Sequence, residues 1–348
     1  MSKPEAVAVI LWLGLTLYAV FGGADFGAGM WDLLAGRGQD ETGRPGARPR
    51  TDRARAQIDH SIGPVWEANH VWLIFCLVVL WTAFPEAFAA VMTTLYIPLA
   101  LAALGIVLRG SGFAFRHALP GPWRGPATRI FGISSLLTPF FMGTVAGAIA
   151  AGEVPADGGG DPTASWTGLL PLLTGALFVA AAAYVAAVFL VRDAGAAGDQ
   201  DLQGYFARRA LAMAVVAGGL ATAGILALHD EASFVYDGLT GPGLPLVILS
   251  AICGLVALAI LAQGVRGGFN RRMIFALRPA AVGAVVAVIW GWFVAQHPDL
   301  LPGQLTIEDA AAVDAALTTV IVVFGIAALT CLPALALLYV LAQRDALE

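Results

Sequence analysis

A carboxylate, an amide and an imidazole occur within four residues in the stretch 63–72 (GPVWEANHVW), inside a longer apolar run. Charged groups at the centre of a membrane helix cost about 2.5–3.5 kcal/mol, so they are rare and usually face a partner or water. On a helical wheel Glu67 shares a face with His60, whereas Asn69 points largely the other way. The stretch therefore presents polar groups to two different neighbours.

A second acid within an apolar run is Asp25, about ten residues or roughly 15 Å from the arginine-rich end of the first predicted span. Glu67 lies at a similar depth in the second span, and Asp59 lies nearer the interface. Carboxylates at matched depth on adjacent helices could exchange a proton through water, which makes these three acids candidates for a proton path. The alternative is that each acid only hydrogen-bonds a backbone group or a tryptophan N–H.

Four further side chains of the second span are candidates to contact another polypeptide or its cofactor: Trp66, Asn69, His70 and Trp72. The polar ones project in different directions from Glu67, so one neighbouring helix cannot pair with them all. Packing or interface anchoring is an equal alternative for the tryptophans. His60 and His70 are ten residues apart, about 15 Å along one helix, which is too far to bind one iron. The three cysteines are isolated, so the sequence predicts no metal site, and no nucleophile–base pair marks a catalytic residue.

Long apolar runs must position these side chains. The chain has 348 residues, of which 59% are hydrophobic and 12% charged, against about 25% charged in a soluble domain. Nine runs reach the roughly 18 residues of a spanning helix; they cover about 6–34, 56–80, 87–108, 127–150, 167–191, 205–228, 243–264, 276–296 and 312–342. The sequence thus predicts an all-α, polytopic membrane protein with about nine transmembrane helices.

Small residues in the first span indicate close packing. Gly23 and Gly27 are four residues apart, as are Asp25 and Gly29. Such spacing places small side chains on one helix face and lets a neighbouring backbone approach closely.

An internal repeat is visible in the segments after the third and seventh spans, 109–116 (RGSGFAFR) and 266–271 (RGGFNR). It predicts two parallel four-helix bundles plus one extra helix. The first unit would cover residues 1–150, the second 151–296, and an outer loop with the ninth helix 297–348. The alternative is that Arg-Gly-Phe suits any cytoplasmic turn.

The arginines predict the orientation. All 18 fall in or beside alternate loops and the C-terminal tail, whereas the opposite loops carry acids and no Lys or Arg. The positive-inside rule makes the arginine side cytoplasmic, which places the N-terminus outside and the C-terminus in the cytoplasm. Arginine-rich loops can also indicate nucleic-acid binding. Their alternation with apolar spans favours topology instead, and we expect no nucleic-acid partner.

Residues 63–73 (GPVWEANHVWL) closely resemble the second-helix signature of subunit II of the cytochrome bd-type quinol oxidases, which include the cyanide-insensitive oxidases. Three other segments resemble the family's counterparts: 24–29 (ADFGAG) in the first helix, 290–292 (WGW) in the eighth, and 305–311 (LTIEDAA) in the outer loop. The resemblance covers almost the whole chain. One departure is that members often read Asp-Gly-Phe-Asp in the first helix, where this chain has Gly22 in place of the first acid.

The resemblance implies a subunit of a quinol:oxygen oxidoreductase that reduces dioxygen to water in aerobic respiration at the bacterial plasma membrane. It implies that haem b and haem d are held by the partner subunit I, which forms a heterodimer with this chain. This subunit would be non-catalytic alone and would supply proton access, with dioxygen access as a further candidate role. The candidates to face the partner, a haem or the dioxygen route would be Trp66, Asn69, His70 and Trp72. Small accessory subunits, lipids and quinone are further candidate partners.

The residues alone leave two alternatives open. One is a proton-coupled secondary transporter, although the chain lacks paired broken helices at corresponding places in both units. The other is a structural scaffold that only stabilises the oxidase. Haem absorption in material purified with a partner, and none in the chain alone, would favour the oxidase over a transporter. A Glu67→Gln variant would separate a proton path from a scaffold, because only the path needs the titrating group.

Overall fold

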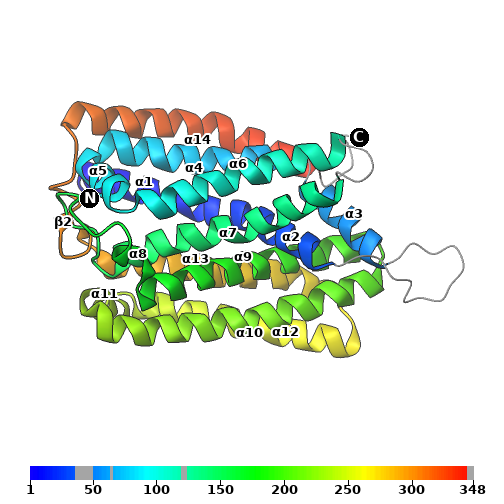
Figure 1. Cartoon of the computed structure of the whole chain (residues 1–348). Helices are drawn as coiled ribbons and strands as arrows, with labels where there is room; N and C mark the ends of the chain where they lie inside the picture. The colour runs from blue at the N-terminus through cyan, green and yellow to red at the C-terminus, as the bar shows by residue number, and fades with distance from the viewer. Residues whose placement is uncertain (36–49, 63–65, 119–123, 343–348) are drawn as a thin grey trace, which may run out of the picture.

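The computed structural model shows long helices that run roughly parallel, with short elements gathered at the end that carries the N-terminus (Figure 1). It describes residues 1–35, 50–62, 66–118 and 124–342, without the side chains of Ile62, residues 66–68, His117, Arg124 and several residues beyond Cys331. In chain order the elements are α1 (Lys3–Leu17), η1 (Tyr18–Gly22), α2 (Gly23–Leu34), α3 (Arg50–Ile62), α4 (Trp66–Ala83), α5 (Pro85–Thr94), α6 (Tyr96–Ala118), α7 (Arg124–Ala150), α8 (Ala164–Thr167), α9 (Leu169–Ala196), α10 (Gln200–Glu231), α11 (Ser233–Thr240), α12 (Leu244–Gly267), α13 (Arg271–Gln296), β1 (Asp299–Leu301), β2 (Leu305–Thr306) and α14 (Asp314–Ala342).

Eight of the described helices are long and apolar enough to cross a membrane. A ninth span results if α4 and α5, which are bent by 118° relative to each other, are counted as one. The all-α, polytopic class predicted from the sequence is therefore confirmed. The opposite end of the bundle, where α3 lies beside the start of α10, carries Arg50, Arg53, Arg55, Arg208 and Arg209, and we call it the arginine-rich end (Figure 1).

The predicted second span, 56–80, falls on two of the described helices. Its first part lies in α3 and its second part in α4, and residues 63–65 between them lie outside the described residues. His60, which the sequence analysis placed on one helix with His70, lies in α3, and His70 lies in α4.

The predicted third span, 87–108, is also wrong in its bounds. Leu95, with φ −108° and ψ 27°, separates α5 from α6. Helix α6 continues to Ala118, so Arg109 and Arg116, which the sequence assigns to a loop, lie within a helix and are buried. The counterpart of Arg109 in the predicted repeat, Arg266, is exposed near the end of α12.

The first span is continuous but not uniform. Ser2 and Glu5 form a capping box at its start, in which each side chain accepts a hydrogen bond from the other's backbone N–H. Between α1 and α2 the helix widens into the π-helical turn η1, which ends three residues before Asp25. Such turns are rare and often occur at functional sites.

Helix α9 lies at the centre of the bundle, where it packs against α2, α7 and α10. Its most apolar segment is 61% buried, against 6% for α14 at the edge. One core cluster joins Trp31 of α2, Phe131 of α7, Val188 of α9 and Ala281 of α13. Both predicted four-helix units contribute to this core, and their division at residues 150 and 296 stays a prediction.

Candidate functional site

Asp25 of α2 is a buried carboxylate inside the first span. The amide Nδ2 of Asn69 on α4 donates a hydrogen bond to its Oδ2 at 2.5 Å, and the same Nδ2 lies 3.5 Å from the carbonyl oxygen of Phe21. An acid at this depth is expensive unless a polar partner or water faces it. The structure therefore places Asn69 against Asp25 within this chain, and its suggested role toward a partner, a haem or a dioxygen route stays a prediction.

A cavity of about 70 Å³ adjoins this pair. The residues that line it come from the first span, α3, α4 and α9: Phe21, Ala24, Asp25, Ala28, Ser61, Asn69, Ala186, Phe189, Leu190 and Asp193. A water molecule needs about 10–15 Å³ of such volume and two to four polar partners. The cavity has both, since two carboxylates, an amide and a hydroxyl face it, so it can hold several waters.

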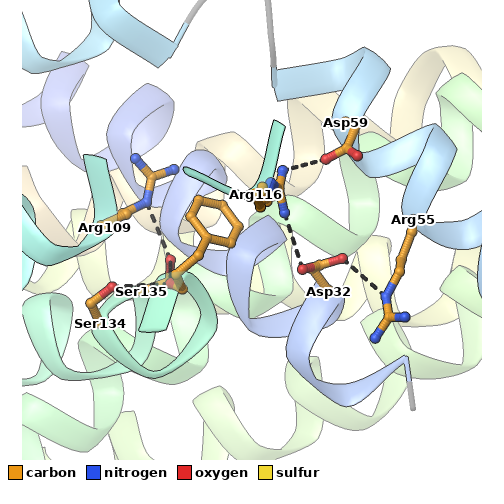
Figure 2. A network of polar contacts seen from close by, with 8 residues as sticks. Asp32, Arg55, Asp59, Arg109, Arg116, Ser134 and Ser135 are labelled. Carbon is orange, nitrogen blue, oxygen red and sulfur yellow. Dashed lines mark hydrogen bonds and ion pairs between the residues drawn. The ribbon is translucent and has the colours of Figure 1, made fainter. Parts of the chain in front are cut away.

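Four charged side chains form a network at the arginine-rich end of the first span (Figure 2). Arg116 of α6 donates through Nη1 to Asp32 Oδ2 at 3.1 Å and through Nη2 to Asp59 Oδ1. The Nε of Arg55 lies 3.4 Å from the other Asp32 oxygen. The network contains two acids and two bases, so its formal charges cancel. The buried charges of Asp32 and Arg116 are thus neutralised by side chains of this chain.

Arg109 of α6 is a second buried guanidinium. Its Nε donates to Ser135 Oγ at 3.2 Å, and its guanidinium carbon lies 4.9 Å from the ring centre of Phe26 and 5.2 Å from that of Phe131. Its Nη2 has no hydrogen-bond partner among the described residues. The carboxylate of Asp25 attracts this guanidinium electrostatically.

The remaining site residues suggested by the sequence are dispersed. Asp59 is bound to Arg116 and does not line the cavity. The half-buried ring of His70 lies 6.0 Å from that of Phe26, and half-buried Trp72 meets Phe75 edge-on at 6.3 Å. Glu67 and Trp66 belong to α4, but their side chains lie outside the described residues.

Several polar residues of the site were missed by the sequence analysis: Asp32, Ser61, Arg109, Arg116 and Asp193. One available signal was the spacing of Arg109 and Arg116, since residues seven apart lie on one helix face. Assigning both to a loop concealed it. Asp193 follows Arg192 at the end of the fifth predicted span, where a charged pair looks like an ordinary solvated helix end.

The chemistry that this arrangement supports is proton handling. A buried carboxylate, an amide and a hydroxyl surround a space that can hold water, and carboxyl and hydroxyl groups can both accept and donate protons. Within the described ranges no group of three or more His, Cys, Asp or Glu side chains could hold a metal ion.

Comparisons with known proteins match this chain along almost its whole length. It is 26% identical over 325 residues to the cytochrome bd ubiquinol oxidase subunit 2 of Bacillus subtilis (strain 168), which covers 89% of this chain and 86% of the relative. It is 29% identical over 157 residues to the cytochrome bd-I ubiquinol oxidase subunit 2 of Escherichia coli (strain K12), covering 44% of this chain and 38% of that protein.

The fold is similar to a solved structure of the bd oxidase from Geobacillus thermodenitrificans, with a TM-score of 0.74 at 23% identity, covering 97% of this chain and 98% of that one. The family model described as cytochrome bd terminal oxidase subunit II matches residues 3–342. A match of that extent decides the family, and this chain belongs to the cytochrome bd terminal oxidase subunit II family.

Proposed function

We propose that this chain is subunit II of a cytochrome bd-type quinol:oxygen oxidoreductase, paired with a haem-bearing subunit I in the bacterial plasma membrane. The family match over residues 3–342 and the eight or nine candidate spans support this proposal. The arginine-rich end would face the cytoplasm by the positive-inside rule. Together with the partner, the chain would take part in the reduction of dioxygen to water by a quinol.

Haem b and haem d belong to the partner in this proposal. Among the described histidines, His229 Nδ1 lies 2.8 Å from an oxygen of Asp230, and His297 Nε2 lies 3.6 Å from an oxygen of Glu5. These two rings are 64% and 47% exposed, at the ends of α10 and α13, where a haem would not be buried between helices. We assign no haem ligand to this chain in this proposal and derive no step through a haem. Affinity purification of the tagged chain should recover a second subunit and haem absorption; recovery of this chain alone would favour the transporter reading.

The role proposed for this subunit is to bring protons from the cytoplasm to the interior of the complex. Reduction of dioxygen to water consumes protons within the membrane, where bulk water cannot deliver them. The observation that carries the proposal is that Asp25 is buried, bound to Asn69 and open to a cavity large enough for water. Glu67, from the sequence, would be the second acid of the path, and Asp59 the sequence candidate for its cytoplasmic end.

The experiment replaces Asp25 by Asn and Glu67 by Gln in the purified complex. Both changes keep shape and hydrogen bonding but remove the titrating carboxyl. We expect haem content to be unchanged and quinol oxidase turnover to fall tenfold or more, about 1.4 kcal/mol of barrier. Asp157→Asn, an exposed acid outside the spans, is the matched control and should keep wild-type turnover. Wild-type turnover in both Asp25→Asn and Glu67→Gln would leave the scaffold reading instead.

A further inference from the structure

We propose that water and protons enter this chain between α3 and α9, at Ser61 and Asp193, and reach Asp25 through the cavity that these residues line, without passing Asp59. This inference rests on the proposed proton-access function and names its entrance. The sequence analysis predicted a proton-path role for neither Ser61 nor Asp193.

The cavity connects two carboxylates of different exposure. Asp25 at one side is buried, whereas the side chain of Asp193, near the arginine-rich end of α9, is 31% exposed. Seven residues, or about 10 Å of helix, separate Asp193 from Ala186, which also lines the cavity. The cavity thus extends along α9 from a solvent-accessible acid toward the depth of the buried acid.

Asp193 is held in place by groups from two other helices. Ser61 Oγ of α3 donates to its Oδ2 at 3.1 Å, and Arg278 Nη2 of α13 donates to its Oδ1 at 2.5 Å. The same Nη2 donates to the carbonyl oxygen of Phe189 at 2.7 Å. These contacts fix the carboxylate at the edge of the cavity, while the Ser61 hydroxyl can pass a proton from it to a water inside.

Asp59 makes an informative comparison, because its side chain is 33% exposed and is also paired with an arginine. The two acids therefore have similar access to solvent and similar partners. They differ in that Asp193 lines the cavity and Asp59 does not. Instead, Arg116 connects Asp59 to Asp32, and a guanidinium stays charged in proteins, so it does not relay protons.

The first experiment tests whether the cavity is open to water from the proposed cytoplasmic side. Ala186 and Ala187 are neighbouring buried alanines of α9, but only Ala186 lines the cavity. Each would be changed to cysteine in a complex whose subunit II has its own three cysteines replaced by alanine. Sealed inside-out vesicles would be exposed to Ag⁺, then denatured, and the remaining thiols on subunit II counted with a fluorescent maleimide.

We expect Ag⁺ to block Ala186→Cys and to leave Ala187→Cys free, with no block of either in right-side-out vesicles. Equal reaction of Ag⁺ at both positions, or reaction at neither, would contradict the proposal that water enters the cavity from this side. This readout depends neither on turnover nor on a change at Asp193, so it stands even if variants at Asp193 assemble poorly.

The second experiment measures turnover of the complex with Asp193→Asn and Ser61→Ala. Asp201→Asn is the control, because Asp201 is also ion-paired with an arginine at the same end but lies off the cavity. We expect a fivefold or greater loss in Asp193→Asn, a deficit that is larger at pH 8 than at pH 6, and recovery in Asp193→Glu. A merely structural role would give a loss that is independent of pH.

A parallel Asp25→Asn variant separates this inference from the proposed function. If Asp25→Asn is slow while Asp193→Asn and Ser61→Ala match the control, the path stands and this entrance is wrong. Slow turnover in Asp59→Asn with wild-type turnover in Asp193→Asn would move the entrance to Asp59. If Asp25→Asn and Glu67→Gln both turn over normally, the proton-access function itself fails.

Discussion

Gly27 of α2 faces Ala182 of α9 at such close range that a Cβ added to Gly27 would lie 2.0 Å from the carbonyl oxygen of Ala182. It would also lie 2.7 Å from the Cβ of Ala186, which lines the cavity. Backbone atoms cannot rotate away as a side chain can, so a methyl group here must push the two helices apart. The close approach that the small-residue spacing predicts is thus present at Gly27, and it fixes the distance between Asp25 and α9.

Gly27→Ala should therefore destabilise the complex by about 1–3 kcal/mol, the usual cost of overpacking. Gly23→Ala on the same helix is the control, since its Cβ would have no neighbour nearer than 4.0 Å. That change should be neutral or slightly stabilising, because alanine has the higher helix propensity. Thermal unfolding of the detergent-purified complex measures both, and equal melting temperatures for the two variants would contradict the close contact.

The buried pair of Asp32 and Arg116 should contribute more to stability than the exposed pair of Arg53 and Asp201. The side chains of the first pair are 2% and 5% exposed, whereas those of the second are 28% and 51% exposed. Removing one partner of a buried pair leaves an uncompensated charge and costs about 3–5 kcal/mol. Exposed pairs contribute about 0–1 kcal/mol.

The measurement compares thermal unfolding of Asp32→Asn and Asp201→Asn with that of the wild-type complex. Asp32→Asn should lower the melting temperature markedly and Asp201→Asn hardly at all. In a double-mutant cycle, the variant that carries both Asp32→Asn and Arg116→Met should lose less stability than the sum of the losses in the two single variants. Strictly additive losses would show that the pair is not coupled.

Asp161, in the loop before α8, should make stability depend on pH. Backbone N–H groups of Ala164 and Thr163 donate to its carboxylate at 2.7 and 2.8 Å and hold the pKa of Asp161 below its ordinary value. A depressed folded-state pKa contributes stability above the unfolded pKa of about 3.9, and that contribution is lost as pH falls through the folded value.

Asp161→Asn keeps an accepting oxygen but removes the charge. The melting temperature of the wild type should therefore exceed that of the variant by a small, constant amount between pH 8 and pH 5. The difference should shrink only below about pH 4. A difference that grows on acidification would contradict this sign, and Asp157→Asn in the same loop provides the control.

The orientation can be tested by labelling single cysteines in a cysteine-free subunit within the complex. Asp52 of α3 and Asp157 in the loop between α7 and α8 are both exposed and lie at opposite ends of the bundle. A membrane-impermeant maleimide should label Asp52→Cys only in inside-out vesicles and Asp157→Cys only in right-side-out vesicles. Labelling of both from one side would overturn the nine-span topology and the cytoplasmic assignment.

The sequence by itself determined the class of the protein, most of its membrane helices and the polar residues that stand out within them. Apolar runs of spanning length predict membrane helices because each residue's transfer free energy adds along the run. The acid at Asp25 and the stretch 63–72 also stand out locally, since polar groups in hydrocarbon are costly wherever the helix goes next. The motifs in that stretch and in residues 24–29 indicate a family, and the family match confirms it.

Only the tertiary structure decided which of those polar groups meet. Asn69 lies against Asp25, 44 positions away, and Arg116 lies against Asp32, 84 positions away. Whether a charge is neutralised depends on which faces of distant helices pack together, and hydropathy along one run carries no such information. Arg109, Arg116 and Asp193 therefore look like ordinary helix ends in the sequence. In the fold, α6 and α9 bring them to the interior or to the edge of a cavity, where a missing partner would be costly.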